Sequence, residues 1–329
     1  MNVLVTGANG FTGGHLARAL RRRGHSVRGL VRPSNRASAA DIEADGVEVV
    51  YGDLRDAASL DAAVAGVEMV YHVAALYREA GLPPSAYVDV NVRGTERLLD
   101  ASARAGVRRV VHCSTAGVHG HIEHPPATED APLAPGDQYQ SSKLQGEQAA
   151  RSYAGRPGAP EVVIARPVGI YGPGDTRFLK MFRGISRGTF PLLGRGEVFY
   201  HLTYVDDVVE GLRLCGEVPA AAGGTYLIAG PRYTTLRELI ERIAAVLQAA
   251  PPRLRLPIWP VWLAGAACEA VCVPLRINPP LYRRRVDFYR KSRAFDASRA
   301  KREIGFDPAV DLDAGLRRTA DWYRERGLL

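Results

Sequence analysis

The chain has 329 residues, of which 46% are hydrophobic and 24% are charged, so it can bury the core of one large α/β domain or of two smaller ones. Its net charge of +8 comes without a nucleic-acid-binding motif, and its four cysteines do not follow a metal-binding spacing. We therefore expect neither a nucleic-acid partner nor a metal site. The first apolar run is too short for a secretory signal, which indicates a cytoplasmic protein.

A glycine-rich turn follows the first predicted strand. The apolar run 3–5 predicts a buried strand, glycines follow at Gly7, Gly10 and Gly13, and an amphipathic helix is predicted over 15–23. Gly7 permits a tight turn, Gly10 lets the backbone approach phosphates, and Gly13 lets the helix pack on the strand. The pattern predicts a site for the pyrophosphate of a dinucleotide. The glycines alone also leave open an ordinary strand-to-helix turn.

Strands and helices alternate through the first half of the chain. This alternation predicts a doubly wound parallel sheet of the Rossmann type, in which ligands bind at the carboxyl ends of the strands. The further strands are expected over residues 26–31, 47–51, 67–73, 107–114 and 161–166, and helices over 57–65, 87–105 and 141–153.

After residue 167 the pattern is interrupted by prolines and glycines, and the segments that follow predict a smaller C-terminal α/β domain. Residues 203–229 contain strand and helix signals and are expected to return to the first sheet. The dinucleotide-binding domain is then 1–167 with 203–229, and the substrate domain is 168–202 with 230–329. Asp206 and Asp207 are expected to cap one helix, and Thr234 or Thr235 another, over 236–247. A last helix is expected over 312–326.

Tyr139 and Lys143 are four residues apart at the start of a predicted helix, so they share a face. An ammonium near a phenol lowers the pKa of the tyrosine from about 10 toward neutrality. Such a tyrosine can donate or accept a proton at an alcohol or ketone oxygen. Ser114 and Thr115 end the fifth strand, where a hydroxyl can orient the reacting oxygen. The alternatives are a solvated helix start for the first pair and turn-capping hydroxyls for the second.

Further motifs stand in a fixed order along the chain. With them, the chain resembles the extended short-chain dehydrogenase/reductases, a family that includes nucleotide-sugar epimerases and dehydratases and 3β-hydroxysteroid dehydrogenases. The resemblance covers residues 1–215 closely and the remainder loosely. The motifs are Thr6-Gly7-x-x-Gly10-x-x-Gly13, Gly52-Asp53-Leu54, His72-Val73-Ala74-Ala75, Asn91-Val92-x-Gly94-Thr95, Ser114-Thr115, Tyr139-x-x-x-Lys143, Arg166-Pro167, Tyr171-Gly172-Pro173 and Tyr204-Val205-Asp206-Asp207.

The resemblance implies which residues bind the dinucleotide. Asp53 and Leu54 border the adenine, and Ala74 and Ala75 line the middle of the cofactor. Asn91 supports the tyrosine–lysine pair, Lys143 holds the nicotinamide ribose, and the nicotinamide is bordered by Arg166, Pro167 and Val168. The set is completed by Tyr139 and by the turn residues Gly7, Asn9, Gly10, Phe11, Thr12 and Gly13. His72 is interpreted as a strand-end histidine without a proton role.

The end of the second strand bears on the choice of cofactor. NAD-preferring relatives carry an acidic residue there, whereas this chain has Val31 followed by Arg32. An arginine can pair with a 2′-phosphate, so we expect NADP. An arginine that faces solvent would be compatible with NAD.

The sequence predicts an NAD(P)-dependent oxidoreductase that transfers a hydride between nicotinamide and a secondary alcohol or ketone. The first alternative is a nucleotide-sugar epimerase with the same residues and a retained NAD, and the second is a non-catalytic dinucleotide-binding regulator. Ala116 and Gly117 replace the acidic pair of the dehydratases, and Gly169 and Tyr200 stand where many epimerases have other residues. Arg177, Arg195, Arg255 and the run 283–285 could still contact a phosphate.

The resemblance also bears on partners. Relatives commonly form dimers through the helices of the tyrosine–lysine pair, so we expect a homodimer with a small-molecule substrate. The apolar segment 257–275 is too short and too interrupted by Glu269 for a membrane span. It could contact a membrane surface beside the basic stretch, line an apolar pocket, or form an ordinary core helix.

Overall fold

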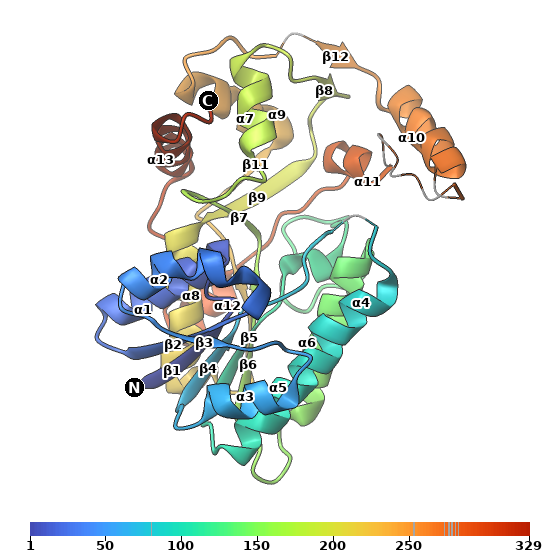
Figure 1. The fold of residues 1–329 in the computed structure, drawn as a ribbon. Coiled ribbons are helices and arrows are strands. Elements are labelled where there is room, and N and C mark those ends of the chain that lie inside the picture. The colour runs from blue at the N-terminus through green and yellow to red at the C-terminus, as the bar shows by residue number, and fades with distance from the viewer. Residues whose placement is uncertain are drawn as a thin grey trace.

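A seven-stranded sheet forms the centre of the larger of two lobes (Figure 1). The computed structural model describes residues 1–79, 81–252, 254–272, 274–275, 277, 279, 281 and 283–329, without the side chains of 284 and 285. All neighbouring strands are parallel, as predicted. Their order is β10 (Thr225–Ile228), β6 (Glu161–Pro167), β5 (Arg109–Cys113), β4 (Met69–His72), β1 (Asn2–Thr6), β2 (Ser26–Val31) and β3 (Glu48–Tyr51).

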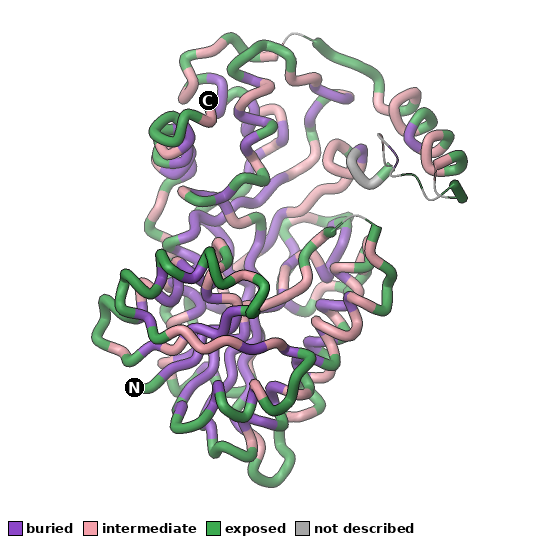
Figure 2. The backbone as a smooth tube through the Cα atoms, viewed as in Figure 1, coloured by how far each residue is buried: buried purple, intermediate pink, exposed green. Residues whose placement is uncertain are grey.

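Helices cover both faces of this sheet, because each strand is apolar on both sides. In β1, Val3 and Val5 pack into one core and Leu4 packs into the core on the opposite face. Figure 2 shows the strands of this sheet as a largely buried centre. The helices of the first face are α1 (Phe11–Arg22), α2 (Ala40–Ala44), α8 (Val205–Glu217) and α12 (Ser298–Ile304). Those of the second are α3 (Ala57–Val64), α5 (Gly94–Arg104) and α6 (Gln138–Tyr153).

The segment before α5 differs from the prediction of one continuous helix over 87–105. It consists of α4 (Pro84–Val88) and a π-helical turn (Asp89–Arg93) that runs into α5. The turn places Asn91 against α6, where the bare backbone of Gly146 allows a close approach: a Cβ there would lie 2.3 Å from the Asn91 carbonyl oxygen. The π-helical turn thus lies at a close contact between this segment and α6.

The smaller lobe is built on a three-stranded sheet of β7 (Gly169–Tyr171), β9 (Phe199–Tyr204) and β11 (Tyr233–Thr235). Strand β9 pairs in parallel with β7 and antiparallel with β11. The helices α7 (Leu179–Ser186), α9 (Leu236–Val246) and α13 (Leu312–Glu325) share a second core with this sheet. The remaining elements are β8 (Leu192–Leu193), β12 (Arg255–Leu256), α10 (Ile258–Cys272) and α11 (Arg283–Val286).

Two segments cross the expected boundary between the lobes. Strand β9 pairs within the smaller sheet, although its last two residues lie in the segment expected to return to the larger one. Helix α12, assigned from sequence to the substrate domain, packs with Ile304 against the larger sheet beside β10. The division into two domains stays a prediction.

The expected helix caps are found in one case and not in the other. Thr235 caps α9, because its hydroxyl accepts a hydrogen bond from the Glu238 amide at 3.1 Å. Helix α8 begins after Tyr204 without a side-chain cap from the aspartates. Asp207 instead accepts hydrogen bonds from the amides of Ala309 and Val310, at 2.9 and 3.1 Å.

Candidate active site

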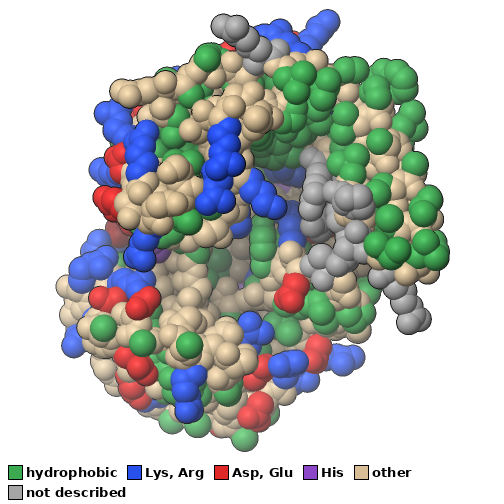
Figure 3. Space-filling model, turned by 45° about the horizontal axis from the view of Figure 1, so that its top comes forward, with side chains coloured by type: hydrophobic (Ala, Val, Ile, Leu, Met, Phe, Trp, Pro, Cys, Tyr) green, Lys and Arg blue, Asp and Glu red, His purple; other side chains and the backbone are tan. Residues whose placement is uncertain are grey.

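Two adjoining cavities lie at the carboxyl ends of the strands of the larger sheet, and Figure 3 shows the hollow between the lobes. The larger cavity has a volume of about 710 Å³ and is lined by the glycine turn and by residues that follow β2, β3 and β4. The predicted cofactor residues that line it are Gly7, Asn9, Gly10, Phe11, Thr12, Gly13, Arg32, Asp53, Leu54, Ala74 and Ala75.

The glycine turn brings the N-terminus of α1 to the floor of the larger cavity. Gly7 has a φ of +69°, and a Cβ at Gly13 would lie 2.2 Å from the Gly7 carbonyl oxygen. Side chains at these two positions would not fit the glycine turn. The first turn of α1 carries no acidic residue, so its amides and its positive dipole end are suited to an anion. The turn therefore fits the pyrophosphate of a dinucleotide.

Cations gather at the far end of the larger cavity. Arg32 is exposed and lines it, and Arg55 lines it from the turn after β3. Arg55 also binds Asp53, with Nη2 2.7 Å from Oδ2, and this ion pair lowers the pKa of the aspartate. The sequence analysis missed Arg55, although it stands next to the Gly52-Asp53-Leu54 motif.

The smaller cavity has a volume of about 290 Å³ and brings the predicted catalytic residues together. Ser114 and Thr115 reach it from the end of β5, and Tyr139 and Lys143 from α6. Asp137 caps α6, since it accepts a hydrogen bond from the Gln140 amide at 2.8 Å. The cap fixes the first turn of the helix and thereby the position of the tyrosine. Pro167 and Val168, at the end of β6, also line this cavity.

Burial dominates the electrostatics of the catalytic pair. It raises the pKa of Tyr139, which Arg78 and Arg177 oppose, and it lowers the pKa of Lys143. This corrects the expectation that Lys143 draws the pKa of the tyrosine toward neutrality, because the cations that act on the phenol here are two arginines. Tyr139 is therefore protonated at neutral pH.

The two hydroxyls at the end of β5 differ in their hydrogen bonds. Thr115 Oγ1 accepts a hydrogen bond from the Gly117 amide at 3.1 Å, so its own proton remains available to a ligand. Ser114 Oγ is buried beside the Glu147 carboxylate, whose pKa it helps to lower. Thr115 therefore has the hydroxyl proton that is available to a ligand.

Two predicted cofactor residues line neither cavity. Arg166 is buried and bound to Glu147, with Nε 3.0 Å from Oε2, and it also contacts His119 and the Glu129 carbonyl. Asn91 joins the Leu76 backbone to the Ser142 hydroxyl, at 2.7 to 3.0 Å. It supports the tyrosine–lysine helix as expected, but through Ser142 and without contact to either cavity. Both side chains hold the walls of the site in place.

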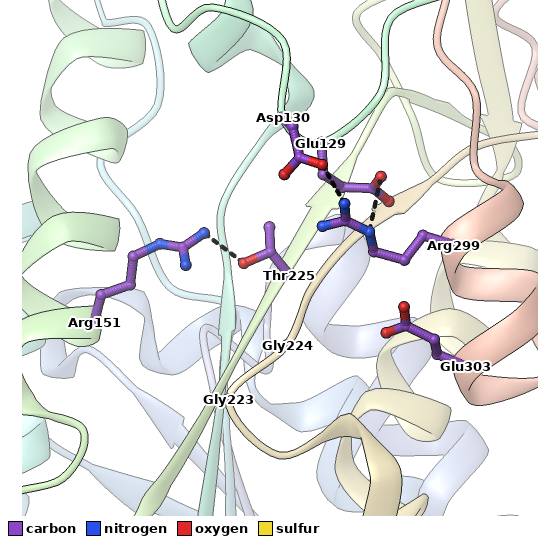
Figure 4. Close-up of a pocket in the computed structure, with 8 residues that line it drawn as sticks. All are labelled: Glu129, Asp130, Arg151, Gly223, Gly224, Thr225, Arg299 and Glu303. Atoms are coloured by element: carbon purple, nitrogen blue, oxygen red, sulfur yellow. Dashed lines mark hydrogen bonds and ion pairs between the residues drawn. The ribbon is translucent and has the colours of Figure 1, made fainter.

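A third cavity lies at the opposite end of β10 and contains none of the predicted site residues (Figure 4). Its charged side chains already have partners in the protein: Arg299 contacts Asp130 and stands 3.7 Å from Glu129, Arg151 pairs with Glu147 and donates to the Thr225 hydroxyl, and Glu303 accepts from the Tyr226 hydroxyl. Glu129 also accepts a hydrogen bond from the Leu227 amide at 2.9 Å. These contacts tie α12 and α6 to the edge of the sheet, so we interpret the cluster as structural.

Further functional candidates line the smaller cavity from distant segments. Tyr77 packs edge-on against Tyr139, with ring centres 4.8 Å apart, and the Arg78 guanidinium lies 5.5 Å from the centre of the Tyr139 ring. Arg177, Tyr200 and Arg293 line the same cavity. The sequence analysis named two of these residues for other reasons: Arg177 as a possible phosphate contact, and Tyr200 as a departure from many epimerases.

The other arginines proposed from the sequence for phosphate contact have different positions. Arg195 and Arg255 line neither cavity. Arg283 binds Glu269, with Nε 2.7 Å from Oε2. The side chains of Arg284 and Arg285 lie outside the described residues.

A glycine turn at the start of a parallel sheet, next to a cavity with a tyrosine and a lysine one helical turn apart, defines a dinucleotide-dependent dehydrogenase or reductase fold. Residues 3–229 match the model of the NAD dependent epimerase/dehydratase family. The chain belongs to this family, and it is an enzyme of the extended short-chain dehydrogenase/reductase type.

Relatives with different activities align over the whole chain. Sterol demethylase protein B of Methylococcus capsulatus is 33% identical, with 100% of each chain covered. The 2-alkyl-3-oxoalkanoate reductase of Stenotrophomonas maltophilia is 31% identical over 97% of this chain and 98% of its own. The structure of a dTDP-glucose 4,6-dehydratase of Streptomyces venezuelae, which holds NAD, has a TM-score of 0.80 and 30% identity, with 99% of this chain and 98% of that chain covered.

Proposed function

We propose that the chain is an NAD(P)-dependent oxidoreductase that transfers a hydride between nicotinamide and a secondary alcohol or ketone. The observation that carries this proposal is the convergence of Thr115, Tyr139 and Lys143 on one cavity that adjoins the glycine-turn cavity. A non-catalytic regulator would have no use for this arrangement.

The side chains of the smaller cavity perform the proton transfer. In reduction, Tyr139 donates its phenolic proton to the carbonyl oxygen, and its raised pKa keeps it protonated for this step. Thr115, with Ser114 beside it, donates a hydrogen bond to the same oxygen and holds it near the phenol. Arg78 and Arg177, whose charges oppose the rise in the pKa of Tyr139, stabilise the phenolate that remains. Lys143 would hold the ribose of the bound nicotinamide, as the family resemblance implies. When bound, the dinucleotide supplies or takes the hydride.

The substitution Tyr139→Phe tests this proposal. It removes the proton donor and leaves the glycine turn untouched, so we expect turnover to fall by about 100-fold or more while dinucleotide affinity is retained. The control is Tyr153→Phe in the same helix, because the Tyr153 hydroxyl lines neither cavity and donates a hydrogen bond to the exposed Asp100 side chain. Steady-state rates and dinucleotide titration measure both effects. Unchanged turnover in Tyr139→Phe would overturn the role of Tyr139.

The relatives and the cavity walls support an alcohol or ketone with an apolar part. One relative is named as a reductase of 2-alkyl-3-oxoalkanoates, and two Arabidopsis thaliana relatives as 3β-hydroxysteroid dehydrogenase/decarboxylases. The smaller cavity has an apolar wall to match. That wall consists of Val168, Ile170, Phe178, Leu202 and Phe295.

A nucleotide-sugar epimerase is the second candidate. It is supported by a 28% identical relative in Escherichia coli, named as a 4-epimerase of a diphospho-undecaprenol-linked sugar, and by the arginines that line the smaller cavity. An epimerase retains its cofactor through turnover, whereas a reductase exchanges it. Mass spectrometry of the purified protein distinguishes them: bound NAD with a nucleotide-sugar supports the epimerase, and no retained ligand supports the exchanging reductase.

We further propose that NADP is the preferred dinucleotide. Support comes from Val31 at the end of β2, where no carboxylate is available, and from Arg32 and Arg55 in the larger cavity. A 2′-phosphate would pair with such cations. We expect NADPH to bind at least about tenfold more tightly than NADH, and Arg32→Ala to reduce this ratio. Equal affinities of the unmodified protein for the two dinucleotides would contradict the proposal.

Three further properties remain proposals. Helix α10 is largely exposed, with Trp259 68% and Leu263 51% accessible, which supports contact with a membrane surface; sedimentation with lipid vesicles tests it. No helix in the described part of the chain is long and apolar enough to cross a bilayer.

A homodimer through α6 follows from the family resemblance, and light scattering tests it. The four free cysteines support a reducing, cytoplasmic location.

A further inference from the structure

The smaller cavity is lined by cations and by no carboxylate among the described residues. Arg78, Lys143, Arg177 and Arg293 all contribute to its wall. Two of these have acidic partners behind the wall: Arg78 Nε lies 2.8 Å from Asp137, and Arg177 Nε lies 2.7 Å from Asp175. Their charges are therefore largely balanced within the protein.

Arg293 has no acidic partner of this kind among the described residues. Its Nε is buried without a hydrogen-bond partner, and no carboxylate of the described residues lies within 4.0 Å of its guanidinium. Its one side-chain hydrogen bond to a described residue is long: Nη1 stands 3.5 Å from the Tyr200 hydroxyl, which donates its own proton to the Phe288 carbonyl. Arg293 as a residue is half-buried, and a buried, unpaired N–H group such as its Nε–H is costly unless a group from the cavity takes it up.

The backbone around Arg293 is held firmly at the cavity. Its amide donates to the Phe199 carbonyl at 2.8 Å, and the residue forms a bridge with Tyr200 of β9. Two residues further on, the Phe295 amide donates to Nδ1 of His201, and Nε2 of that ring donates to the Gly230 carbonyl. The guanidinium is thus presented by a fixed strand segment and not by a free surface side chain.

We propose that Arg293 binds an anionic group of the substrate, a carboxylate or a phosphate, while Tyr139 acts on the hydroxyl or carbonyl of the same molecule. The inference rests on the proposed function, because it takes the smaller cavity as the substrate site. It adds that the substrate carries a negative charge in addition to its reacting oxygen. The guanidinium suits either anion, since its paired N–H groups match two oxygens at once.

The test compares probes that differ in charge. Binding of 3-hydroxydecanoate, its methyl ester and UDP to the NADP⁺-loaded protein is measured by calorimetry. We expect at least one of the two anions to bind, and Arg293→Gln to weaken it about tenfold or more. The ester should bind the variant and the unmodified protein alike. Loss confined to 3-hydroxydecanoate identifies a carboxylate, and loss confined to UDP identifies a phosphate.

Two controls separate charge recognition from structural damage. Arg293→Lys keeps the charge and should recover part of the anion affinity, and Arg187→Gln removes an exposed arginine that lines neither cavity. Anion affinities unchanged in Arg293→Gln, equal losses for anion and ester, or no binding of either anion would each overturn the inference. Activity that depends on Tyr139 would stand in all three cases, so failure of the inference is distinguishable from failure of the proposed function.

Discussion

At the scale of the residue, the buried His72 side chain of β4 is hydrogen-bonded to α5 and to β1, and both hydrogen bonds require the neutral form of its ring. Its Nε2–H donates to the Thr95 hydroxyl at 3.0 Å, because that hydroxyl donates in turn to the Asn91 carbonyl. Its Nδ1 accepts from the Thr6 hydroxyl at 2.9 Å, and the Thr6 oxygen accepts from the Ala74 amide. The ring is neutral, and burial lowers its pKa to about 3.

This arrangement predicts acid sensitivity. The unfolded chain takes up a proton at His72 near pH 6.5, whereas the folded protein does so only near pH 3. Stability contributed by the neutral ring is present above pH 6.5 and is lost as the pH falls through this interval. We expect His72→Asn to reduce the pH dependence of the free energy of unfolding by about 1.4 kcal/mol per pH unit within it.

Urea unfolding at several pH values between 7.5 and 5 measures the effect. The exposed His124, replaced by Asn, is the matched control and should leave the pH dependence as it is. Parallel stability curves for His72→Asn and the unmodified protein would show that His72 is not the group that titrates.

At the scale of the element, the two aspartates at the start of α8 have unequal roles. Asp207 binds the amides of Ala309 and Val310 and so ties the segment before α13 to the first turn of α8. The Asp206 side chain is 62% exposed, and its recorded partner is His15, 3.9 Å away. One carboxylate connects distant segments, and the other lies on the surface.

The two aspartates allow a prediction about stability, in which Asp206 is the control for Asp207. We expect Asp207→Ala to lower the free energy of unfolding by about 3 kcal/mol, because two amides lose a charged acceptor. Asp206→Ala should change it by about 0.5 kcal/mol or less. Chemical unfolding of both variants measures the difference. Equal losses would show that the contacts of Asp207 to the C-terminal segment do not stabilise the fold.

Local sequence patterns predicted the elements of the larger sheet well, because parallel strands buried on both faces are continuous apolar runs. The seven strands therefore lie close to their predicted positions. No local pattern marks the π-helical turn before α5, which lies where Asn91 packs against the distant Gly146. The caps show the same limit: Thr235 acts within its own helix, whereas the partners of Asp207 are about a hundred residues away.

At the scale of the whole molecule, the candidate site combines predictable and unpredictable parts. The glycine turn, Thr115, Tyr139 and Lys143 follow local motifs at strand ends or in one helical turn, and they line the two cavities. Arg78 and Arg293 come from a loop and from a late segment that returns to β9. No local pattern marks such residues, because only the tertiary fold brings them to the cavity.

The two cavities share part of their walls: Thr12, Val73, Ala75, Tyr77 and Arg177 line both. A dinucleotide in the larger cavity would thus form one side of the compartment that receives the second reactant. Binding energies of the two reactants are then coupled, and each strengthens the other to the same extent. We expect the second reactant to bind more tightly to the dinucleotide-loaded protein than to the unloaded protein, and calorimetry with and without the dinucleotide measures the difference.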